Sequence, residues 1–114
     1  MVSWIGSTPE HGVPESAGFF AYADAKLAAD DHLRGTDLDW TILGPGTLTD
    51  DPPSGRIALL PEAGAVPAGT DTSVPRADVA QVAAAALREP ATVGRFVRFS
   101  AGDTPIPAAL RNLE

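Results

Sequence analysis

The chain has 114 residues, of which 44% are hydrophobic and 20% charged, and its formal net charge at pH 7 is -7. This length is close to the usual size of one domain, and the composition is that of a globular protein. The negative charge argues against sequence-independent binding of nucleic acid, which needs clustered Lys and Arg. The lack of cysteine excludes disulfides and thiolate metal sites, and the two histidines, His11 and His32, are too far apart for a convincing zinc site.

Neither a membrane anchor nor an export signal is visible in the sequence. No apolar run approaches the roughly 18 residues that a membrane helix needs, and the N-terminus lacks a basic segment followed by an apolar one. We therefore expect a single domain over residues 1–114, located in the cytoplasm, with no metal site and no membrane or nucleic-acid partner.

The first third of the chain predicts a strand, a loop and a long helix. Residues 1–5 form a short apolar run that is typical of a buried strand. Residues 8–18 are rich in Pro and Gly and predict a loop, in which Ser16 is a possible helix cap. Residues 17–34 lack proline and predict the best helix of the chain, ended by Gly35.

One side of this helix is expected to face the core. The residues that recur at helical spacing are Phe19, Tyr22, Ala25, Ala29 and Leu33. Asp24 and Asp31 fall on the opposite side, which we expect to be solvated.

The rest of the chain predicts further strands and helices in alternation. Residues 39–43 are β-rich and are followed by Gly44-Pro45-Gly46, which predicts a buried strand that enters a tight loop. Residues 56–60 predict a short strand, and residues 61–72 a loop. Residues 95–100 contain two arginines among β-prone residues and predict a strand near a sheet edge. Residues 107–113 predict a short closing helix.

A second helix is expected to begin at Ser73 or Pro75 and to end before Pro90. Its core-facing side is predicted to carry Val79, Val82, Ala83 and Ala86. Strands and helices that alternate at these lengths indicate the α/β class. We expect a partial Rossmann-like three-layer fold, with a mostly parallel sheet of about three main strands and flanking helices.

Tyr22 and Lys26 are the strongest candidates for a chemical role. They are the only tyrosine and the only lysine of the chain, and their spacing places both on one face of the helix. A neighbouring ammonium favours the ionised form of a phenol, which can then exchange a proton with an alcohol or carbonyl oxygen during hydride transfer. Ser3 ends the first strand and could hydrogen-bond the same oxygen.

A purely structural interpretation is also open. Tyr22 could pack at the rim of the core, Lys26 could pair with Asp30, and Ser3 could be an ordinary strand-end serine. Other polar groups favour structural roles as well: Asp30, Asp31 and His32 indicate a solvated acidic patch. Trp40 is expected in the core, and Arg76 and Asp78 are expected to stabilise the start of the second helix.

Longer segments around the pair carry a family resemblance. The run from Tyr22 to Asp50 resembles the segment from the catalytic helix to the loop after the next strand in atypical, NmrA-like short-chain dehydrogenase/reductases. Ser-Val-Pro-Arg-Ala-Asp-Val-Ala at residues 73–80 is similar to the family's Ser-Arg-x-Asp-Val-Ala helix start. Gly-Asp-Thr-Pro-Ile at residues 102–106 is similar to its closing segment.

The resemblance implies roles for individual residues. Tyr22 would be the proton-transfer residue, Lys26 its partner and a ligand of the nicotinamide ribose, and Ser3 a candidate for the polarising hydroxyl. The same resemblance places Pro45, Gly46 and Thr47 beside the nicotinamide of NAD or NADP.

Two positions depart from the family pattern: Trp4 stands where a second serine is frequent, and Gly44 where arginine usually precedes Pro-Gly. The departures keep two hypotheses open. One is a fragment of an NAD(P)-dependent oxidoreductase or epimerase-like enzyme acting on an unidentified small molecule. The other is a non-enzymatic, cofactor-sensing or protein-binding module.

The resemblance covers only the C-terminal half of the family's domain, because the chain has no Gly-x-x-Gly-x-x-Gly turn to receive the pyrophosphate. The explanations left open are a truncated reading frame, a cut or proteolysed product, and a small protein that works as a half. We expect little or no cofactor binding by the chain alone. We also expect a homo-oligomer, most simply a two-fold dimer that pairs the edge at residues 1–5 or packs the Tyr22 helices together.

Overall fold

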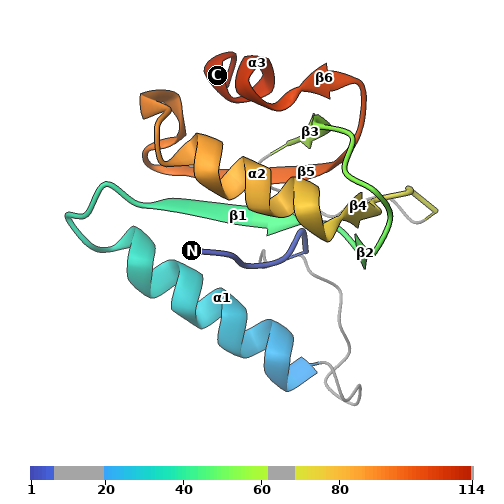
Figure 1. The fold of residues 1–114 in the computed structure, drawn as a ribbon. Coiled ribbons are helices and arrows are strands. Elements are labelled where there is room, and N and C mark those ends of the chain that lie inside the picture. The colour runs from blue at the N-terminus through green and yellow to red at the C-terminus, as the bar shows by residue number, and fades with distance from the viewer. Residues whose placement is uncertain (7–19, 62–68, 114) are drawn as a thin grey trace.

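The structure, a computed structural model, describes residues 1–6, 20–61 and 69–113. Its elements in chain order are α1 (Phe20–Arg34), β1 (Thr41–Pro45), β2 (Leu48–Thr49), β3 (Arg56–Leu60), β4 (Val74–Pro75), α2 (Arg76–Ala86), the 3₁₀ turn η1 (Pro90–Thr92), β5 (Arg95–Ala101), β6 (Thr104–Pro105) and α3 (Ile106–Arg111). Figure 1 shows α1 on one side of β1, and α2 and α3 on the other. The predicted partial Rossmann-like α/β fold is confirmed. The predicted loop at 8–18, with Ser16, and Phe19 lie outside the described residues.

The main sheet is mixed, with strand order β1-β5-β3-β6. β1 and β5 run parallel, whereas β3 pairs antiparallel with both β5 and β6. A separate parallel pair, β2 and β4, lies beyond the end of β1. The N-terminal segment continues the sheet on the far side of β1. Val2 bridges Leu43 in parallel, and the Ser3 amide donates to the Leu43 carbonyl at 2.6 Å. The buried strand predicted at residues 1–5 is thus present only as an extended segment bridged to β1, in which Ser3 and Ile5 are buried but Met1 and Val2 are exposed.

The strand predicted at residues 95–100 is not near an edge: β5 lies between β1 and β3. The prediction was wrong because the arginines were taken as a sign of solvent. Arg98 is only 2% exposed. Its Nε donates to the Ile5 carbonyl at 2.7 Å and its Nη1 to the Pro61 carbonyl at 3.0 Å. Backbone carbonyls thus satisfy a buried guanidinium, which makes an interior position tolerable.

The hydrophobic core lies between the sheet and the layer of α2 and α3. Its buried members are Leu43, Ile57, Val74, Val82, Val97, Phe99, Ile106, Ala109 and Leu110. Val79, Ala83 and Ala86 pack against this cluster, which confirms the face predicted for the second helix. That helix begins at Arg76 and ends at Ala86, and Pro90 opens η1 instead of extending it.

The start of α2 is tied to the loop before β3. Asp78 is fully buried, and its carboxylate accepts from the Gly55 amide at 2.9 Å and from the Ser54 amide at 3.0 Å. Arg76 forms an exposed ion pair with Asp50 at 3.1 Å. Asp78 therefore serves the packing of α2 against another segment, and not only the helix start to which it was assigned.

The inward face predicted for α1 is wrong in large part. Tyr22 is 46% exposed, and Ala25 and Ala29 are exposed as well. The buried residues of α1 are Ala23 and Asp30. The reason is that α1 packs beside the N-terminal segment. Ser3 and the Val2 carbonyl of that segment hydrogen-bond to Asp30 and Lys26, so these polar side chains point inward. Asp24 and Asp31 are exposed, as predicted.

Two element boundaries differ from the sequence-based expectation. The strand expected at residues 39–43 is β1, Thr41–Pro45, so Gly44 and Pro45 belong to the strand and do not end it. The closing helix starts at Ile106, one residue early, and ends at Arg111. α1 ends as expected at Gly35, whose amide donates to the Asp31 and His32 carbonyls. Among the residues that the structure describes, none of the helices has the length and apolarity to cross a membrane.

Candidate functional site

A cavity of about 400 Å³ lies where the N-terminal segment and β1 end, beside the first turns of α1 and α2. It is lined by Val2, Ser3, Trp4, Ile5, Tyr22, Lys26, Pro45, Gly46, Leu48 and Val79. The carboxyl ends of parallel strands are where α/β folds place their ligands. The lining includes three candidates singled out for chemistry, Ser3, Tyr22 and Lys26, and two of the three residues expected beside a nicotinamide.

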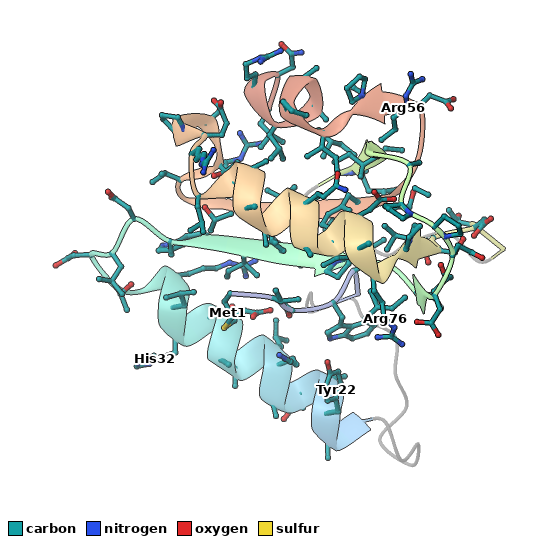
Figure 2. The ribbon with its side chains drawn as sticks, viewed as in Figure 1. Met1, Tyr22, His32, Arg56 and Arg76 are labelled. Carbon is teal, nitrogen blue, oxygen red and sulfur yellow. The ribbon has the colours of Figure 1, made fainter. Side chains whose placement is uncertain are left out.

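Tyr22 and Lys26 reach this cavity from adjacent turns of α1. Figure 2 shows Tyr22 near the start of α1, with His32 near its other end and pointing away from the sheet. The Lys26 ammonium lies 5.9 Å from the centre of the Tyr22 ring. The same ammonium donates to the Val2 carbonyl at 3.1 Å. Lys26 therefore joins α1 to the N-terminal segment and does not pair with Asp30.

Ser3 is 6% exposed, and its hydroxyl donates to Asp30 Oδ2 at 2.7 Å. The prediction of a solvated acidic patch is thus wrong for Asp30, which is fully buried, although Asp31 and His32 are exposed. Because its proton is directed at a carboxylate, the Ser3 oxygen offers lone pairs to any other group in this arrangement. Within residues 1–6, 20–61 and 69–113, no cluster of three His, Cys, Asp or Glu side chains could hold a metal ion.

Pro45 and Gly46 form the floor of the cavity at the end of β1. Gly46 is required there, because a Cβ atom at this position would overlap the Thr72 carbonyl. Thr47 is exposed and is not part of the lining, and its own carbonyl accepts from the Val74 amide at 2.8 Å. The structure therefore groups Pro45 and Gly46 with the Tyr-Lys pair and leaves Thr47 outside.

The two departures from the family pattern have physical explanations. The Trp4 ring packs over Gly6, so closely that a Cβ atom on this glycine would overlap it. At Gly44 a Cβ atom would meet the Phe96 ring. Phe96 in turn lies under the Arg34 guanidinium, 5.2 Å from the ring centre. Gly44 is therefore matched to the aromatic residue on the neighbouring strand.

Three contributors were not assigned to the site from the sequence, although Asp30 was considered as a partner of Lys26 and Val79 as a core residue. Leu48 and Val79 line the cavity from elements that follow β1. Asp30 holds Ser3 from one turn beyond Lys26. Its position four residues after Lys26, on the helical face of the pair, is the signal that could have found it.

One carboxylate, in the turn before β4, has a shifted pKa. Asp71 precedes β4, and its Oδ1 accepts from the Ser73 hydroxyl at 2.7 Å and from the Ser73 amide at 3.0 Å. These hydrogen bonds, the hydroxyl first, lower the pKa of Asp71 below its ordinary value. They fix the turn that leads into β4 and α2.

Comparisons with known proteins identify a matching family and several relatives. The model of a family described as NAD(P)H-binding matches residues 1–90. The Bacillus subtilis (strain 168) protein named "Uncharacterized sugar epimerase YhfK" is 35% identical over 92 residues, which are 81% of this chain and 40% of that protein. The chain therefore spans about two fifths of that curated relative.

Solved structures agree over nearly the whole chain. The Bacillus halodurans protein named "Putative NAD-dependent epimerase/dehydratase" superposes with a TM-score of 0.85 at 32% identity, over 99% of this chain and 50% of that one. A short-chain dehydrogenase/reductase from Veillonella parvula DSM 2008, in complex with NADP, gives a TM-score of 0.67 at 24% identity, over 91% and 50% of the two chains. This second likeness concerns the fold alone.

Proposed function

The chain belongs to the NAD(P)H-binding family, and from that membership we propose that it supplies the proton-transfer side of an NAD(P)-dependent oxidoreductase or epimerase of the NmrA-like short-chain dehydrogenase/reductase type. The observation that carries the proposal is one cavity, at the carboxyl ends of the strands, that is lined by Ser3, Tyr22, Lys26 and Pro45 together. In the relatives, which are about twice as long as this chain, further residues complete the fold.

The proposed chemistry assigns one step to each side chain. The Tyr22 hydroxyl gives a proton to the substrate carbonyl oxygen in reduction, or takes one from the alcohol in oxidation. The Lys26 ammonium lies beside the ring, where its positive charge offsets negative charge that develops on the phenol oxygen during the transfer. Ser3 assists only after its hydroxyl turns from Asp30 toward the substrate oxygen. The nicotinamide, when bound, supplies or accepts the hydride.

The cavity suits the nicotinamide end of such a cofactor. Its volume of about 400 Å³ lies within the range of small-molecule sites. Apolar side chains of Val2, Ile5 and Val79 offer a surface for a planar ring. Lys26 is the side chain placed to reach a ribose hydroxyl. The pyrophosphate and the adenosine would need residues outside this chain.

A second candidate function is cofactor sensing or protein binding without turnover. It is favoured by the Ser3 hydroxyl, which donates to Asp30, and by Lys26, which donates to the Val2 carbonyl. Side chains that are hydrogen-bonded within the protein can shape a cavity without taking part in catalysis. The packing of Gly44 against Phe96 is compatible with this alternative as well.

Calorimetric titration with NADPH, followed by turnover assays on ketones, quinones and nucleotide sugars, separates the two. We expect the 114-residue chain alone to bind NAD and NADP weakly, with no micromolar affinity, because the pyrophosphate contacts lie elsewhere. A protein in which these 114 residues are joined to the rest of a relative's fold should bind NADPH and turn over substrate. Binding without turnover on any substrate class would favour the sensing function, and micromolar binding by the chain alone would contradict the proposal.

We also propose that the assembled protein is a homodimer formed through α1. Support comes from the face that was expected to point inward: Tyr22, Ala25 and Ala29 are exposed there, and the two alanines would let a second helix approach closely. A two-fold axis would pair identical faces and close the assembly. Sedimentation should show a dimer that Ala25→Glu converts to a monomer. A stable monomer at micromolar concentration would contradict the proposal.

A further inference from the structure

The Ser3 hydroxyl is held between two elements of the fold. The N-terminal segment lies between β1 and α1 (Figure 1), and the Ser3 amide donates to the Leu43 carbonyl of β1 at 2.6 Å. On the other side, the Ser3 hydroxyl donates to Asp30 Oδ2 of α1 at 2.7 Å. Asp30 is fully buried and Ser3 nearly so, which leaves little room for water to compete. A hydrogen bond to a carboxylate is about twice as strong as one between neutral groups, so the Ser3 proton stays directed at Asp30.

Ser3 belongs to the cavity wall, whereas Asp30 is not among the described residues that line the cavity. The effect of Asp30 on a ligand therefore passes through Ser3. A serine hydroxyl has one proton to donate and two lone pairs that accept. Because the proton is given to Asp30, the Ser3 oxygen meets a ligand as an acceptor. Asp30 thus decides in which sense Ser3 forms a hydrogen bond with a ligand.

The other polar side chains of the wall offer the opposite capacity. Within the described part of the chain, they belong to Trp4, Tyr22 and Lys26. The indole N–H and the ammonium are donors only, and the phenol can donate or accept. A ligand carbonyl is therefore matched by Tyr22 or Lys26 but not by Ser3. A ligand that has acceptors alone leaves the Ser3 lone pairs without a donor, and an unsatisfied buried acceptor is unfavourable.

We propose that Asp30 holds Ser3 as an acceptor and thereby makes the cavity select ligands that carry a hydroxyl group in addition to the oxygen that meets Tyr22. The substrate class that fits is a hydroxy-carbonyl compound or, in the opposite direction, a diol. The carbonyl oxygen accepts from Tyr22 while the hydroxyl donates to Ser3. Asp30 is a positioning residue, because it touches Ser3 and not the ligand. This inference rests on the proposed function for the role of Tyr22, and it gives Ser3 a role that needs no turn of its hydroxyl.

The test titrates the 114-residue chain with small ketones and follows the backbone amides of Ile5 and Gly46, which lie in the cavity wall, by NMR. The probes are cyclohexanone, 2-hydroxycyclohexanone and 2-methoxycyclohexanone, which share the ring and the carbonyl. The hydroxy compound adds an O–H donor, whereas the methoxy compound adds an oxygen that can only accept. The hydroxy compound should bind about tenfold more tightly than the methoxy compound, which should bind no more tightly than cyclohexanone.

Two substitutions should remove this preference in opposite ways. In Ser3→Ala the acceptor is gone, so the hydroxy compound loses about tenfold in affinity and the methoxy compound changes by less than about threefold. In Asp30→Ala the Ser3 hydroxyl can turn and donate, so the methoxy compound gains about threefold or more in affinity. A merely structural role of Asp30 would not strengthen binding of any ligand. Asp31→Ala, which removes a carboxylate from the exposed side of the same helix, is the matched control and should keep the preference.

Circular dichroism of each variant checks that the chain still folds, and the parent chain and Ser3→Ala decide the matter if Asp30→Ala does not fold. The proposal is overturned if none of the ketones binds, if the hydroxy and methoxy compounds bind equally to the parent chain, or if Ser3→Ala keeps the preference. It is also overturned if a folded Asp30→Ala chain shows no gain for the methoxy compound.

Failure of the proposed function is read separately. The expected preference without turnover in a protein that joins these residues to the rest of a relative's fold would keep the role of Asp30 and reject the enzymatic function. Turnover that depends on Tyr22, with equal binding of the hydroxy and methoxy compounds, would keep the function and reject the role of Asp30.

Discussion

The two faces of the sheet are held to their helices in different ways. Toward α2 and α3 the contacts are apolar, and every member of the buried core cluster belongs to β1 or to the chain after it. Toward α1 fewer apolar residues are buried, among them Ala23, Ile42 and Phe96. Polar and aromatic contacts are added there: Ser3 with Asp30, Lys26 with the Val2 carbonyl, and Arg34 over Phe96. Apolar burial dominates the first face, and a few directional contacts contribute a larger share of the second. The candidate site lies mainly on the second face, where single substitutions can alter it without unfolding the core.

The largest effect is expected in the core. Phe99→Ala removes a fully buried ring between the sheet and α2 and should lower the free energy of unfolding by about 3–5 kcal/mol. Urea denaturation followed by circular dichroism measures it. The control, Leu87→Ala, changes a side chain that is 90% exposed at the end of α2 and should alter stability by only about 0.5 kcal/mol. Equal losses in the two variants would show that the core does not lie where we place it.

A smaller effect is expected on the α1 face. Ser3→Ala and Asp30→Ala both remove the hydrogen bond between Ser3 and Asp30, so a double-mutant cycle isolates it. A hydrogen bond to a charged group contributes about 1.5–3 kcal/mol. Hydrogen exchange should show the loss in the amides of α1 and the N-terminal segment, while amides of β5 stay protected. Additive single-variant effects, or loss of protection across β5, would contradict a face held by separate contacts.

The smallest effect concerns the turn at Asp71. Hydrogen bonds from Ser73 lower the pKa of Asp71 in the folded chain, so its stabilising contribution is complete above the ordinary carboxyl pKa. That contribution is lost as the pH falls through the lowered value. Asp71→Asn should therefore remove a small part of the acid dependence of stability, in the pH range from the ordinary carboxyl pKa down through the lowered one. Identical pH profiles for the variant and the parent chain would contradict the assignment.

The same comparison explains which parts of the structure the sequence could predict. The face of α2 that carries Val79 and Val82 was predicted correctly, and so was β3, because both pack apolar side chains into the core. The same rule, that apolar side chains face the core, was applied to α1, and the buried face that it predicted was wrong. Its apolar stripe contains the exposed residues Tyr22, Ala25 and Ala29, whereas its buried side includes Asp30.

The hydrophobic pattern of the sequence could not predict which polar side chains are buried, for a physical reason. The position of Arg98 depends on the carbonyls of Ile5 and Pro61, which are distant in sequence, so no local signal marks it as interior. The candidate site could be predicted in part from the sequence. The spacing of Tyr22 and Lys26 placed them on one helix, and the strand ends placed Ser3 and Pro45 at the same edge of the sheet. The bond from Ser3 to Asp30 required the three-dimensional packing of α1.

The central proposal is that Tyr22 transfers the proton in an NAD(P)-dependent reaction. The measurement is kcat/KM of a protein that joins these 114 residues, with Tyr22→Phe, to the rest of a relative's fold. The substrate class is the one that the turnover screen identifies, and the affinity for NADPH is measured beside it. Loss of the hydroxyl should lower kcat/KM by about 100-fold or more, because general acid–base catalysis contributes at least that much. NADPH affinity should stay within about threefold, since the ring remains in place. Undiminished turnover in Tyr22→Phe would contradict the account and assign the Tyr-Lys pair to structure.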